Sequence, residues 1–251
     1  VVKAWLIGDS TMTDYSAEED YMSKRYPMTG WGQVFQSFLC SDSLYLVRHL
    51  FAADSVKVDN RARGGRSTRS FFEEGRWSEV YRNLQPGDIV MIQFGHNDAS
   101  VAKGERYVSI PGYKEFLRLY VNQSREKGAT PFLITPVARN YPWEAGSLKN
   151  THGEYPEAMR TVARELGVYL IDLSQLSMTF FSTRGQDFVT TTYFMNLPSG
   201  VYEGYPDGSS DNTHFQPAGA LEVANLVFQE MKRLTPIVPV KERLRKSAAK
   251  K

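Results

Sequence analysis

The sequence predicts an α/β protein: a single-domain, three-layer α/β/α sandwich with a central parallel sheet of about five strands. Two observations predict this fold. Short apolar runs typical of β-strands alternate along the chain with longer segments typical of helices, and such alternation gives a parallel sheet covered by helices on both sides. In addition, residues 1–234 contain no internal repeat and no Pro/Gly-rich linker, which indicates one domain rather than two.

Five segments are expected to form the strands. The clearest is Ile89–Phe94, which follows the turn at Pro86–Asp88 and is almost continuously apolar. Such a run is typical of a strand that is buried on both faces of a sheet. The remaining strands are expected at Val2–Ile7, Ser55–Val58, Pro131–Thr135 and Val168–Leu173.

Three helices are expected between and after these strands. The segments Pro111–Lys127 and Tyr155–Leu166 are each followed directly by a glycine, which favours the end of a helix. The last helix is expected at Pro217–Leu234, with its proline in the first turn, where proline is tolerated. Its apolar stripe is expected to consist of Leu221, Ala224, Phe228, Met231 and Leu234.

Two segments, Val137–Gly153 and Asn196–Thr213, show no clean helix or strand period. Both are rich in Gly, Pro, Asn and aromatic residues, so we expect loops there. Long loops at the carboxyl ends of parallel strands usually build the binding site of an open α/β sheet. A surface loop without a function fits the same pattern, and length alone does not decide between the two.

Composition and charge narrow the function classes. Apolar residues make up 41% of the 251 residues and no apolar run is long, so we expect no membrane span, which needs ~20 such residues. The net charge of +2 comes from residues 235–251, which contain six basic side chains and one acidic one. The preceding residues, 1–234, carry a net charge of −3. This argues against nucleic-acid binding, and residues 235–251 are expected to form a flexible basic tail.

The single cysteine, Cys40, rules out an internal disulfide framework and a cysteine-based zinc site. We expect it to be a packing residue of a first helix, which lies before the stretch Leu44–Ala53. The chain starts with Val1 and Val2, without an initiating Met or a charged and apolar leader. We therefore expect a mature or trimmed product whose export signal lay upstream, and a secreted or periplasmic location.

Four polar motifs lie where strands are predicted to end or a helix to begin. A serine can act as a nucleophile when an imidazole removes its proton, and a carboxylate can orient that imidazole. Side-chain amides and unobstructed backbone N–H groups can stabilise an oxyanion. In chain order, the motifs are Gly8-Asp9-Ser10-Thr11, Gly64-Gly65-Arg66-Ser67, Gly95-His96-Asn97-Asp98 and Asp211-Asn212-Thr213-His214.

Each motif also has an ordinary structural explanation. Gly-Asp-Ser fits a turn, Gly-Gly fits a turn with positive φ, and Asp211 or Thr213 fits a cap of the following helix. His96 fits a local hydrogen-bonding residue. In a parallel sheet, however, all four motifs fall on the same side of the sheet, which favours one shared site.

The four motifs resemble those of the SGNH (GDSL-type) hydrolase superfamily, which has a flavodoxin-like fold and is named after its Ser, Gly, Asn and His. GDSTM, RGGRSTRSF, GHND and DNTHF match its blocks in order, and the resemblance spans residues 1–234. It implies that neither a metal nor an organic cofactor is needed. It further implies Ser10 as the nucleophile, His214 as its base, Asp211 as the residue that orients the base, and the N–H groups of Ser10, Gly65 and Asn97 as oxyanion donors.

A narrower likeness is to rhamnogalacturonan acetylesterases, carried by GRSTRSFFEEGRW, QFGHND, THGEYPEAMR and LPSGVYEGYPDG. It implies a serine esterase that removes O-acetyl groups from pectic polysaccharides or oligosaccharides. The stretch Leu44–Ala53 departs from that pattern and indicates an insertion or a lengthened helix. Two alternatives stay open: an esterase, lipase or thioesterase for another acyl ester such as xylan acetate, and a non-catalytic carbohydrate-binding protein. The sequence does not indicate an oligomeric state.

Four further residues are candidates for substrate binding: Arg66, Arg139, His152 and Tyr205. A planar guanidinium suits the carboxylate of galacturonate, and a tyrosine ring can stack on a sugar. Each residue fits a structural role equally well. The arginines can form intramolecular ion pairs, and the histidine and the tyrosine can anchor the irregular segments in which they lie.

Overall fold

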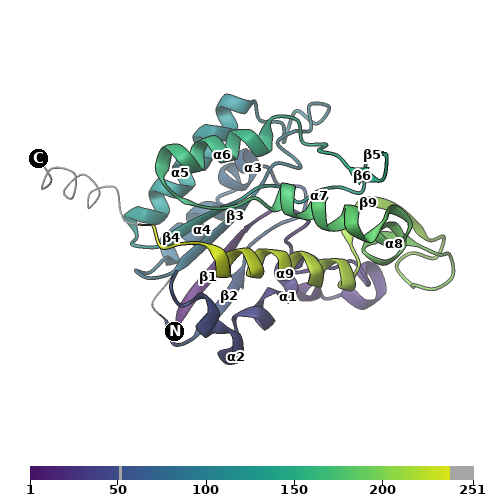
Figure 1. The fold of residues 1–251 in the computed structure, drawn as a ribbon, viewed down its shortest axis with the longest axis horizontal. Coiled ribbons are helices and arrows are strands. Elements are labelled where there is room, and N and C mark those ends of the chain that lie inside the picture. Colours follow the sequence, from purple (N-terminus) through teal and green to yellow (C-terminus); the bar gives the residue numbers. More distant parts are fainter. Residues whose placement is uncertain (51–52, 238–251) are drawn as a thin grey trace, which may run out of the picture.

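The computed structural model describes residues 1–50 and 53–237, and a five-stranded sheet lies at the centre of the fold (Figure 1). The strands are β1 (Val2–Gly8), β2 (Val56–Asn60), β3 (Ile89–Gln93), β4 (Thr130–Ile134) and β7 (Tyr169–Ile171). They lie in the order β2-β1-β3-β4-β7, and all neighbouring pairs are parallel. The predicted parallel sheet, its five strands and their positions in the sequence are therefore confirmed.

The strand order creates a crevice beside β1. The chain passes from β1 to β2 on one side and later returns to place β3 on the other side of β1. In doubly wound α/β sheets, ligands bind outside the carboxyl ends of the strands where the order reverses in this way. The fold thus places a binding position above the carboxyl ends of β1 and β3.

Side chains of each strand alternate between two hydrophobic cores, one on each face of the sheet. In β1, Ala4 and Leu6 belong to one core, and Trp5 and Ile7 belong to the other. All five residues of β3 are buried, because β3 is a central strand covered on both faces. This explains the continuous apolar run that predicts β3 from the sequence.

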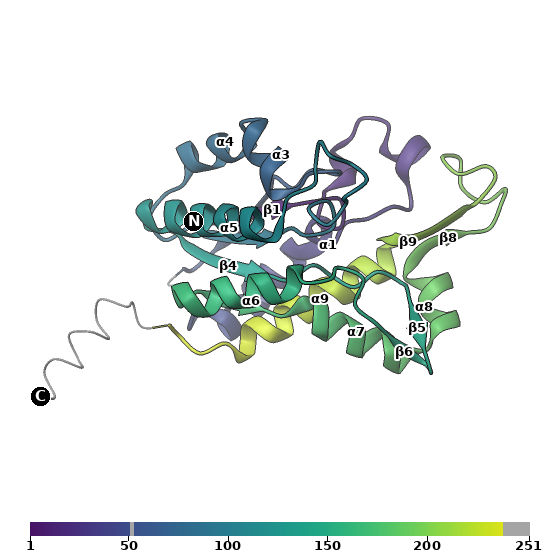
Figure 2. The same cartoon turned by 90° about the horizontal axis from the view of Figure 1, so that it is seen from above.

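Helices cover both faces of the sheet (Figures 1 and 2). On one face, α5 (Ile110–Glu126) and α6 (Tyr155–Leu166) pack on the core that contains Trp5. On the other face, α9 (Pro217–Arg233) packs on the core that contains Leu6. These three helices confirm the three that the sequence predicts, and with the sheet they complete the three-layer sandwich.

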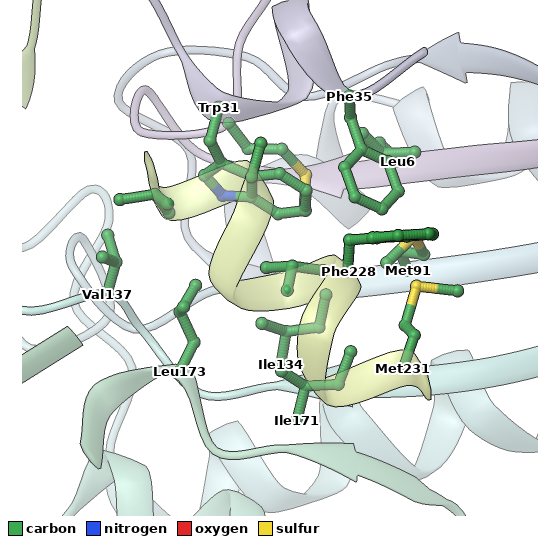
Figure 3. Close-up of a cluster of buried hydrophobic side chains, with 14 of the residues drawn as sticks. Leu6, Trp31, Phe35, Met91, Ile134, Val137, Ile171, Leu173, Phe228 and Met231 are labelled. Atoms are coloured by element: carbon green, nitrogen blue, oxygen red, sulfur yellow. The ribbon is translucent and has the colours of Figure 1, made fainter. Parts of the chain in front are cut away.

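The buried stripe of α9 differs in part from the predicted one. Phe228 and Met231 lie over the sheet beside Leu6 and Met91 (Figure 3), as expected. Leu221, however, is 49% exposed, so its place in the stripe was wrongly predicted. Ala224 is buried as predicted, and the buried face of α9 also includes Ala220, Val223 and Val227, which the predicted stripe left out.

Several further helices were not predicted from the sequence. In α7 (Leu173–Arg184), Leu173 and Phe181 are buried while Leu176 and Phe180 are partly buried, so its apolar residues form no single stripe. The others are too short to show a period. They are α1 (Trp31–Val34), α2 (Ser41–Leu44), α3 (Thr68–Glu73), α4 (Arg76–Asn83), α8 (Gln186–Thr192), the 3₁₀ helices at Tyr15–Ala17, Phe35–Leu39 and Tyr45–Val47, and a π-helical turn at Tyr21–Arg25.

The two segments expected to be irregular each contain an antiparallel hairpin. The short strands β5 (Trp143–Glu144) and β6 (Ser147–Leu148) pair within the first segment. In the second, β8 (Phe194–Leu197) pairs with β9 (Ser209–Phe215). The prediction of a loop over Asn196–Thr213 is therefore wrong at both of its ends.

The outcomes for the cysteine, the Leu44–Ala53 stretch, the basic tail and the expected absence of a membrane span are as follows. Cys40 is exposed between a 3₁₀ helix and α2, so the prediction that it packs inside a helix is wrong. The Leu44–Ala53 stretch forms the end of α2 and a 3₁₀ turn, with residues 51–52 outside the described part. The expected flexible tail lies outside it from residue 238 onward. Within the described ranges, no helix has both the length and the apolar character needed to span a membrane.

Candidate active site

The predicted motifs converge on one cavity. Ser10 follows β1, Gly65 lies between β2 and α3, and Asn97 follows β3. His214 lies on β9, whose hairpin with β8 extends from one end of the molecule (Figure 2). All four residues line a cavity of about 510 Å³. The chain thus brings together side chains that are up to 204 positions apart in the sequence.

Ser10, His214 and Asp211 form a continuous line of hydrogen bonds. The distance from His214 Nε2 to Ser10 Oγ is 2.9 Å, and the distance from His214 Nδ1 to Asp211 Oδ2 is 2.6 Å. The other carboxylate oxygen of Asp211 accepts hydrogen bonds from the backbone N–H groups of Thr213 and His214. Burial alone would raise the pKa of Asp211, but the contacts with His214 and these N–H groups hold the pKa below its ordinary value. Asp211 is thus a carboxylate that can fix the imidazole and stabilise its positive charge.

A buried hydrogen-bond network fixes the turn that carries Ser10. Asp9 Oδ1 accepts hydrogen bonds from the backbone N–H and the hydroxyl of Thr11, at 3.0 and 2.8 Å. Gln93 at the end of β3 donates to the same hydroxyl at 2.6 Å. A Cβ on Gly8 would lie 2.6 Å from the carbonyl oxygen of Gln93, so only glycine allows β1 and β3 to approach here. The turn is therefore tied to both central strands.

Two of the candidate oxyanion donors, Gly65 and Asn97, lie in turns that line the same cavity as Ser10 and His214. Gly65 has φ of +78°, a conformation that glycine adopts without strain. The side chain of Asn97 is 8% exposed; its Nδ2 donates to the carbonyl oxygen of Arg66 at 3.0 Å, and its Oδ1 accepts from Arg106 Nη1 at 3.1 Å. The second N–H of this amide has no protein partner in these contacts. It remains available to a ligand in the cavity.

Cationic side chains dominate the cavity lining. Six of its residues are Lys or Arg, and Glu18 is its one carboxylate. Three of the six pair with acids, because Arg25 contacts Glu18, Arg66 contacts Glu74 and Arg106 contacts Glu105. The other three have no ion-pair partner among the described residues: Arg63, Lys103 and Arg139. The cavity is thus electropositive, although residues 1–234 as a whole are net negative.

The four substrate-binding candidates divide into two groups. Arg66 and Arg139 line the cavity, as expected. His152 does not line it: the ring is 1% exposed, and its Nε2 lies 3.1 Å from His96 Nδ1. Tyr205 is also not part of the lining. Its hydroxyl donates to the carbonyl oxygen of Arg25 at 3.3 Å, so it ties the β8–β9 connection to the π-helical turn.

His96 is a cavity-lining residue held by its neighbours. Burial, with the nearby His152 and Arg139, holds the pKa of His96 well below its ordinary value, and burial lowers the pKa of His152 to about 3. Both rings are therefore neutral near pH 7. Arg139 Nε donates to His96 Nδ1 at 3.4 Å, and His96 Nε2 has no hydrogen-bond partner among the described residues. Sequence reasoning found His96 as a hydrogen-bonding residue but not its pairing with His152.

Sequence reasoning missed Arg106 and Lys103, which line the cavity from the segment between β3 and α5. The only sequence signal available was their position shortly after a strand's carboxyl end. In the part of the chain that the structure describes, no group of three or more His, Cys, Asp or Glu side chains is arranged to hold a metal ion.

A parallel α/β sheet that presents a serine, an imidazole and a carboxylate in hydrogen-bond contact has the arrangement of a serine hydrolase. Sequence comparison agrees with this class. The GDSL-like Lipase/Acylhydrolase family matches residues 6–220, and the chain belongs to this family. The protein is accordingly a carboxylic ester hydrolase.

Individual relatives show a narrower similarity. The chain is 37% identical over 243 residues to the rhamnogalacturonan acetylesterase RhgT of Bacillus subtilis (strain 168), covering 97% of this chain and 94% of RhgT. It is 39% identical over 231 residues to the probable rhamnogalacturonan acetylesterase YesY of the same strain, covering 92% of each. The crystal structure of the Bacillus subtilis protein YxiM superposes with a TM-score of 0.72 at 27% identity, over 92% of this chain and 56% of that one. The similarity to rhamnogalacturonan acetylesterases that the sequence motifs predict is therefore confirmed.

Proposed function

We propose that this protein removes O-acetyl groups from the pectic polysaccharide rhamnogalacturonan, with Ser10 as the nucleophile. The observation that carries this proposal is the line of hydrogen bonds from Ser10 through His214 to Asp211 in an electropositive cavity. The names of RhgT and YesY support the same substrate. A non-catalytic carbohydrate-binding protein would have no need for this line of contacts.

The contacts define the order of proton transfers. His214 Nε2 accepts the proton of Ser10 Oγ as that oxygen attacks the acetyl carbonyl carbon. As the bond between the acetyl carbon and the sugar oxygen breaks, His214 gives the proton to that oxygen; the sugar leaves with a free hydroxyl and the acetyl group stays on Ser10. A water molecule, deprotonated by His214, attacks this acetyl-enzyme, and acetate leaves as Ser10 recovers its proton. Asp211 stabilises the imidazolium that forms in each half of the reaction.

The negative charge that develops on the carbonyl oxygen of the acetyl group needs hydrogen-bond donors beside it in the cavity. The backbone N–H groups of Ser10 and Gly65 and the side-chain amide of Asn97 supply them in this proposal. Donors that are already positioned in a partly buried site stabilise the transition state without reorganising. The two contacts that hold the Asn97 amide give it that fixed position.

The charge of the cavity supports an acidic substrate. Rhamnogalacturonan carries carboxylates on its galacturonate units, and Arg63, Lys103 and Arg139 are cations without an acidic partner at the cavity. Bulk attraction cannot select such a polymer, since residues 1–234 are net negative. Local contacts with these three cations and with hydroxyl groups would therefore provide the recognition.

The direct test compares acetate release from acetylated rhamnogalacturonan and from acetylated xylan. We expect faster release from rhamnogalacturonan, and a larger drop in that rate when salt is added, because salt screens the contacts between carboxylates and exposed cations. Equal rates on both polymers would contradict the pectic substrate while leaving the esterase assignment intact.

A second measurement tests the acyl group and the nucleophile. In a series of p-nitrophenyl esters we expect acetate to be preferred, and we expect Ser10→Ala to abolish turnover. Rapid hydrolysis of chains of eight or more carbons would favour a lipase or thioesterase, and full activity of Ser10→Ala would contradict the mechanism.

We further propose a secreted or periplasmic location, because a polymer of this size is met outside the cytoplasm. Fractionation of the source cells, with the protein detected by antibody, tests this. Recovery from the cytoplasmic fraction alone would contradict it.

A further inference from the structure

We propose that Arg106 is a positioning residue that sets the orientation of the Asn97 side-chain amide and so keeps one of its N–H groups directed at the reacting carbonyl oxygen. This inference rests on the proposed role of Asn97 as an oxyanion donor. It assigns a function to a residue outside the four sequence motifs.

The contacts of Asn97 select one of the two orientations of its amide. Arg106 Nη1 donates to Oδ1 at 3.1 Å, and Nδ2 donates to the carbonyl oxygen of Arg66 at 3.0 Å. If the amide were turned over, its NH₂ group would face the donor of Arg106 and its oxygen would face the carbonyl oxygen of Arg66. Both pairs would then be mismatched, since a guanidinium only donates and a carbonyl oxygen only accepts.

The selected orientation matters because the amide nitrogen has two hydrogens. One is used by the carbonyl oxygen of Arg66, and Asn97 lines the cavity together with Ser10. The second N–H is therefore the group that can reach a ligand. In the opposite orientation, an oxygen would face the developing negative charge and would destabilise it.

Arg106 is itself held in place by the segment between β3 and α5. Its backbone N–H donates to the carbonyl oxygen of Lys103 at 2.9 Å, and Nε donates to Glu105 at 3.2 Å. The guanidinium also lies against the turn of Gly65, where an added Cβ would be 3.5 Å from Nη1. One side chain thus contacts both candidate donor turns, Gly65 and Asn97.

A lysine would not replace this contact fully. The guanidinium is a rigid, planar group that can hold Glu105 and Asn97 with different nitrogens at the same time, whereas an ammonium is a single point of donation on a flexible chain. We therefore expect Arg106→Lys to recover part of the activity that Arg106→Met loses. A role based on charge alone predicts full recovery in Arg106→Lys.

The test is a double-mutant cycle on a small neutral acetyl ester, which measures kcat without contacts to substrate carboxylates. We expect Arg106→Met to lower kcat by about 10- to 100-fold with little change in KM, since misplaced catalytic groups cost rates of this order. In the Asn97→Ala background, Arg106→Met should cause no further loss, because the amide that it orients is absent. Thermal unfolding of each variant shows whether the fold is kept.

The matched control is Arg69→Met. Arg69 tethers the same segment through the carbonyl oxygen of Gly104 at 2.7 Å but is not part of the cavity lining, so its kcat should stay within about twofold of wild type.

The outcomes separate the two proposals. If Asn97→Ala leaves kcat unchanged, the oxyanion role of Asn97 fails, and the positioning role fails with it. If Asn97→Ala slows the reaction but Arg106→Met does not, or if the two losses multiply in the double variant, only the positioning role of Arg106 is overturned.

Discussion

The two sides of the candidate active site are built in different ways. Ser10, Gly65 and Asn97 lie within a few residues of the carboxyl ends of three neighbouring strands of the main sheet, β1, β2 and β3. His214 and Asp211 lie on β9, which pairs only with β8 in a separate two-stranded sheet. We call these the nucleophile side and the base side. The nucleophile side takes its position from the central sheet, whereas the base side depends on how the hairpin is attached to the rest of the protein.

Polar side chains provide much of that attachment. Asn212, beside Asp211, accepts hydrogen bonds at its Oδ1 from Asn140 Nδ2 at 2.9 Å and from Asn196 Nδ2 at 3.0 Å. Its backbone carbonyl oxygen accepts from the N–H of Asn140 at 2.9 Å. Asn140 lies in the segment after β4, so these bonds link the hairpin to the main sheet, beside the packing of Phe194 and Phe215 in the core. We therefore expect the geometry of the base side to be more sensitive to the loss of single polar contacts than that of the nucleophile side.

The largest expected effect on kcat comes from removing the nucleophile, Ser10, or the base, His214. We expect Ser10→Ala and His214→Ala each to lower kcat by roughly 10⁴–10⁶-fold, because neither half of the proton transfer works without the other. For the same reason the double variant should be no slower than either single one. Hydrolysis of p-nitrophenyl acetate measures all three.

Ser16→Ala is the matched control for this comparison, since Ser16 is exposed and lies outside the cavity lining. Its kcat should equal that of wild type. A double variant much slower than each single variant would show that the two sides act independently, against the mechanism proposed.

The next effect in size concerns the donors of the nucleophile side. We expect Asn97→Ala to lower kcat by about 10²–10³-fold, the usual loss for one oxyanion donor. KM should change little, because the donor contacts the transition state more strongly than the substrate. Asn83→Ala on the exposed part of α4 is a control for loss of an asparagine amide. An Asn97→Ala variant that raised KM and kept kcat would assign this side chain to substrate binding.

The difference in attachment can be tested with two variants that each remove buried hydrogen bonds. Asn140→Ala removes the side-chain contact with Asn212 on the base side, and Thr11→Val removes the contact of the Thr11 hydroxyl with Gln93 and Asp9 on the nucleophile side. Either loss should lower the free energy of unfolding by about 1–3 kcal/mol. We expect kcat to fall by up to about 10²-fold in Asn140→Ala but only slightly in Thr11→Val, whose turn stays fixed by the backbone of β1 and β3.

Denaturant unfolding and steady-state kinetics of the same preparations give both quantities. Equal losses of kcat in the two variants would contradict the view that the base side is the more loosely attached one.

The same contrast explains what could be predicted from the sequence. The nucleophile side follows strands whose apolar runs are local and strong, so Ser10, Gly65 and Asn97 could be placed at one edge of the sheet. The hairpin of the base side pairs β8 with β9 across residues 198–208, and its register depends on tertiary contacts rather than on a short turn signal. The motif around His214 was found, but the strand that carries it was predicted to be a loop.

Other residues could not be predicted because their roles depend on the path of a connection. Arg106 reaches Asn97 only because the segment between β3 and α5 folds back, with the N–H of Val108 donating to the carbonyl oxygen of Asp98. Likewise, His152 was expected in the cavity, but it lies in the turn before α6 and is buried with its Nε2 against His96. Residue type and spacing carry no information on such paths.

The smallest expected effect concerns the free energy of unfolding. Its pH dependence should contain a contribution from one buried carboxyl group on the nucleophile side. Asp98, next to Asn97 on the nucleophile side, is fully buried; its Oδ1 accepts two hydrogen bonds from Thr68, and its Oδ2 has no partner within residues 1–50 and 53–237. Burial raises the pKa of Asp98 to about 7. Between pH 4 and pH 7 the folded protein therefore holds a proton that the unfolded chain has lost, so this group lowers the free energy of unfolding as pH rises through that range.

Asp98→Asn removes this titration, and the decline in stability between pH 4 and pH 7 should shrink by on the order of 2 kcal/mol. The buried His96 and His152 act in the opposite direction, because their lowered pKa values make the folded state less stable as pH falls below about 6.5. Both proteins share the contribution of the two histidines, so it cancels when the free energy of unfolding of Asp98→Asn is subtracted from that of wild type. Denaturant unfolding at several pH values measures it, and parallel curves for the two proteins would show that Asp98 stays ionised in the folded state and that the nucleophile side tolerates a buried charge.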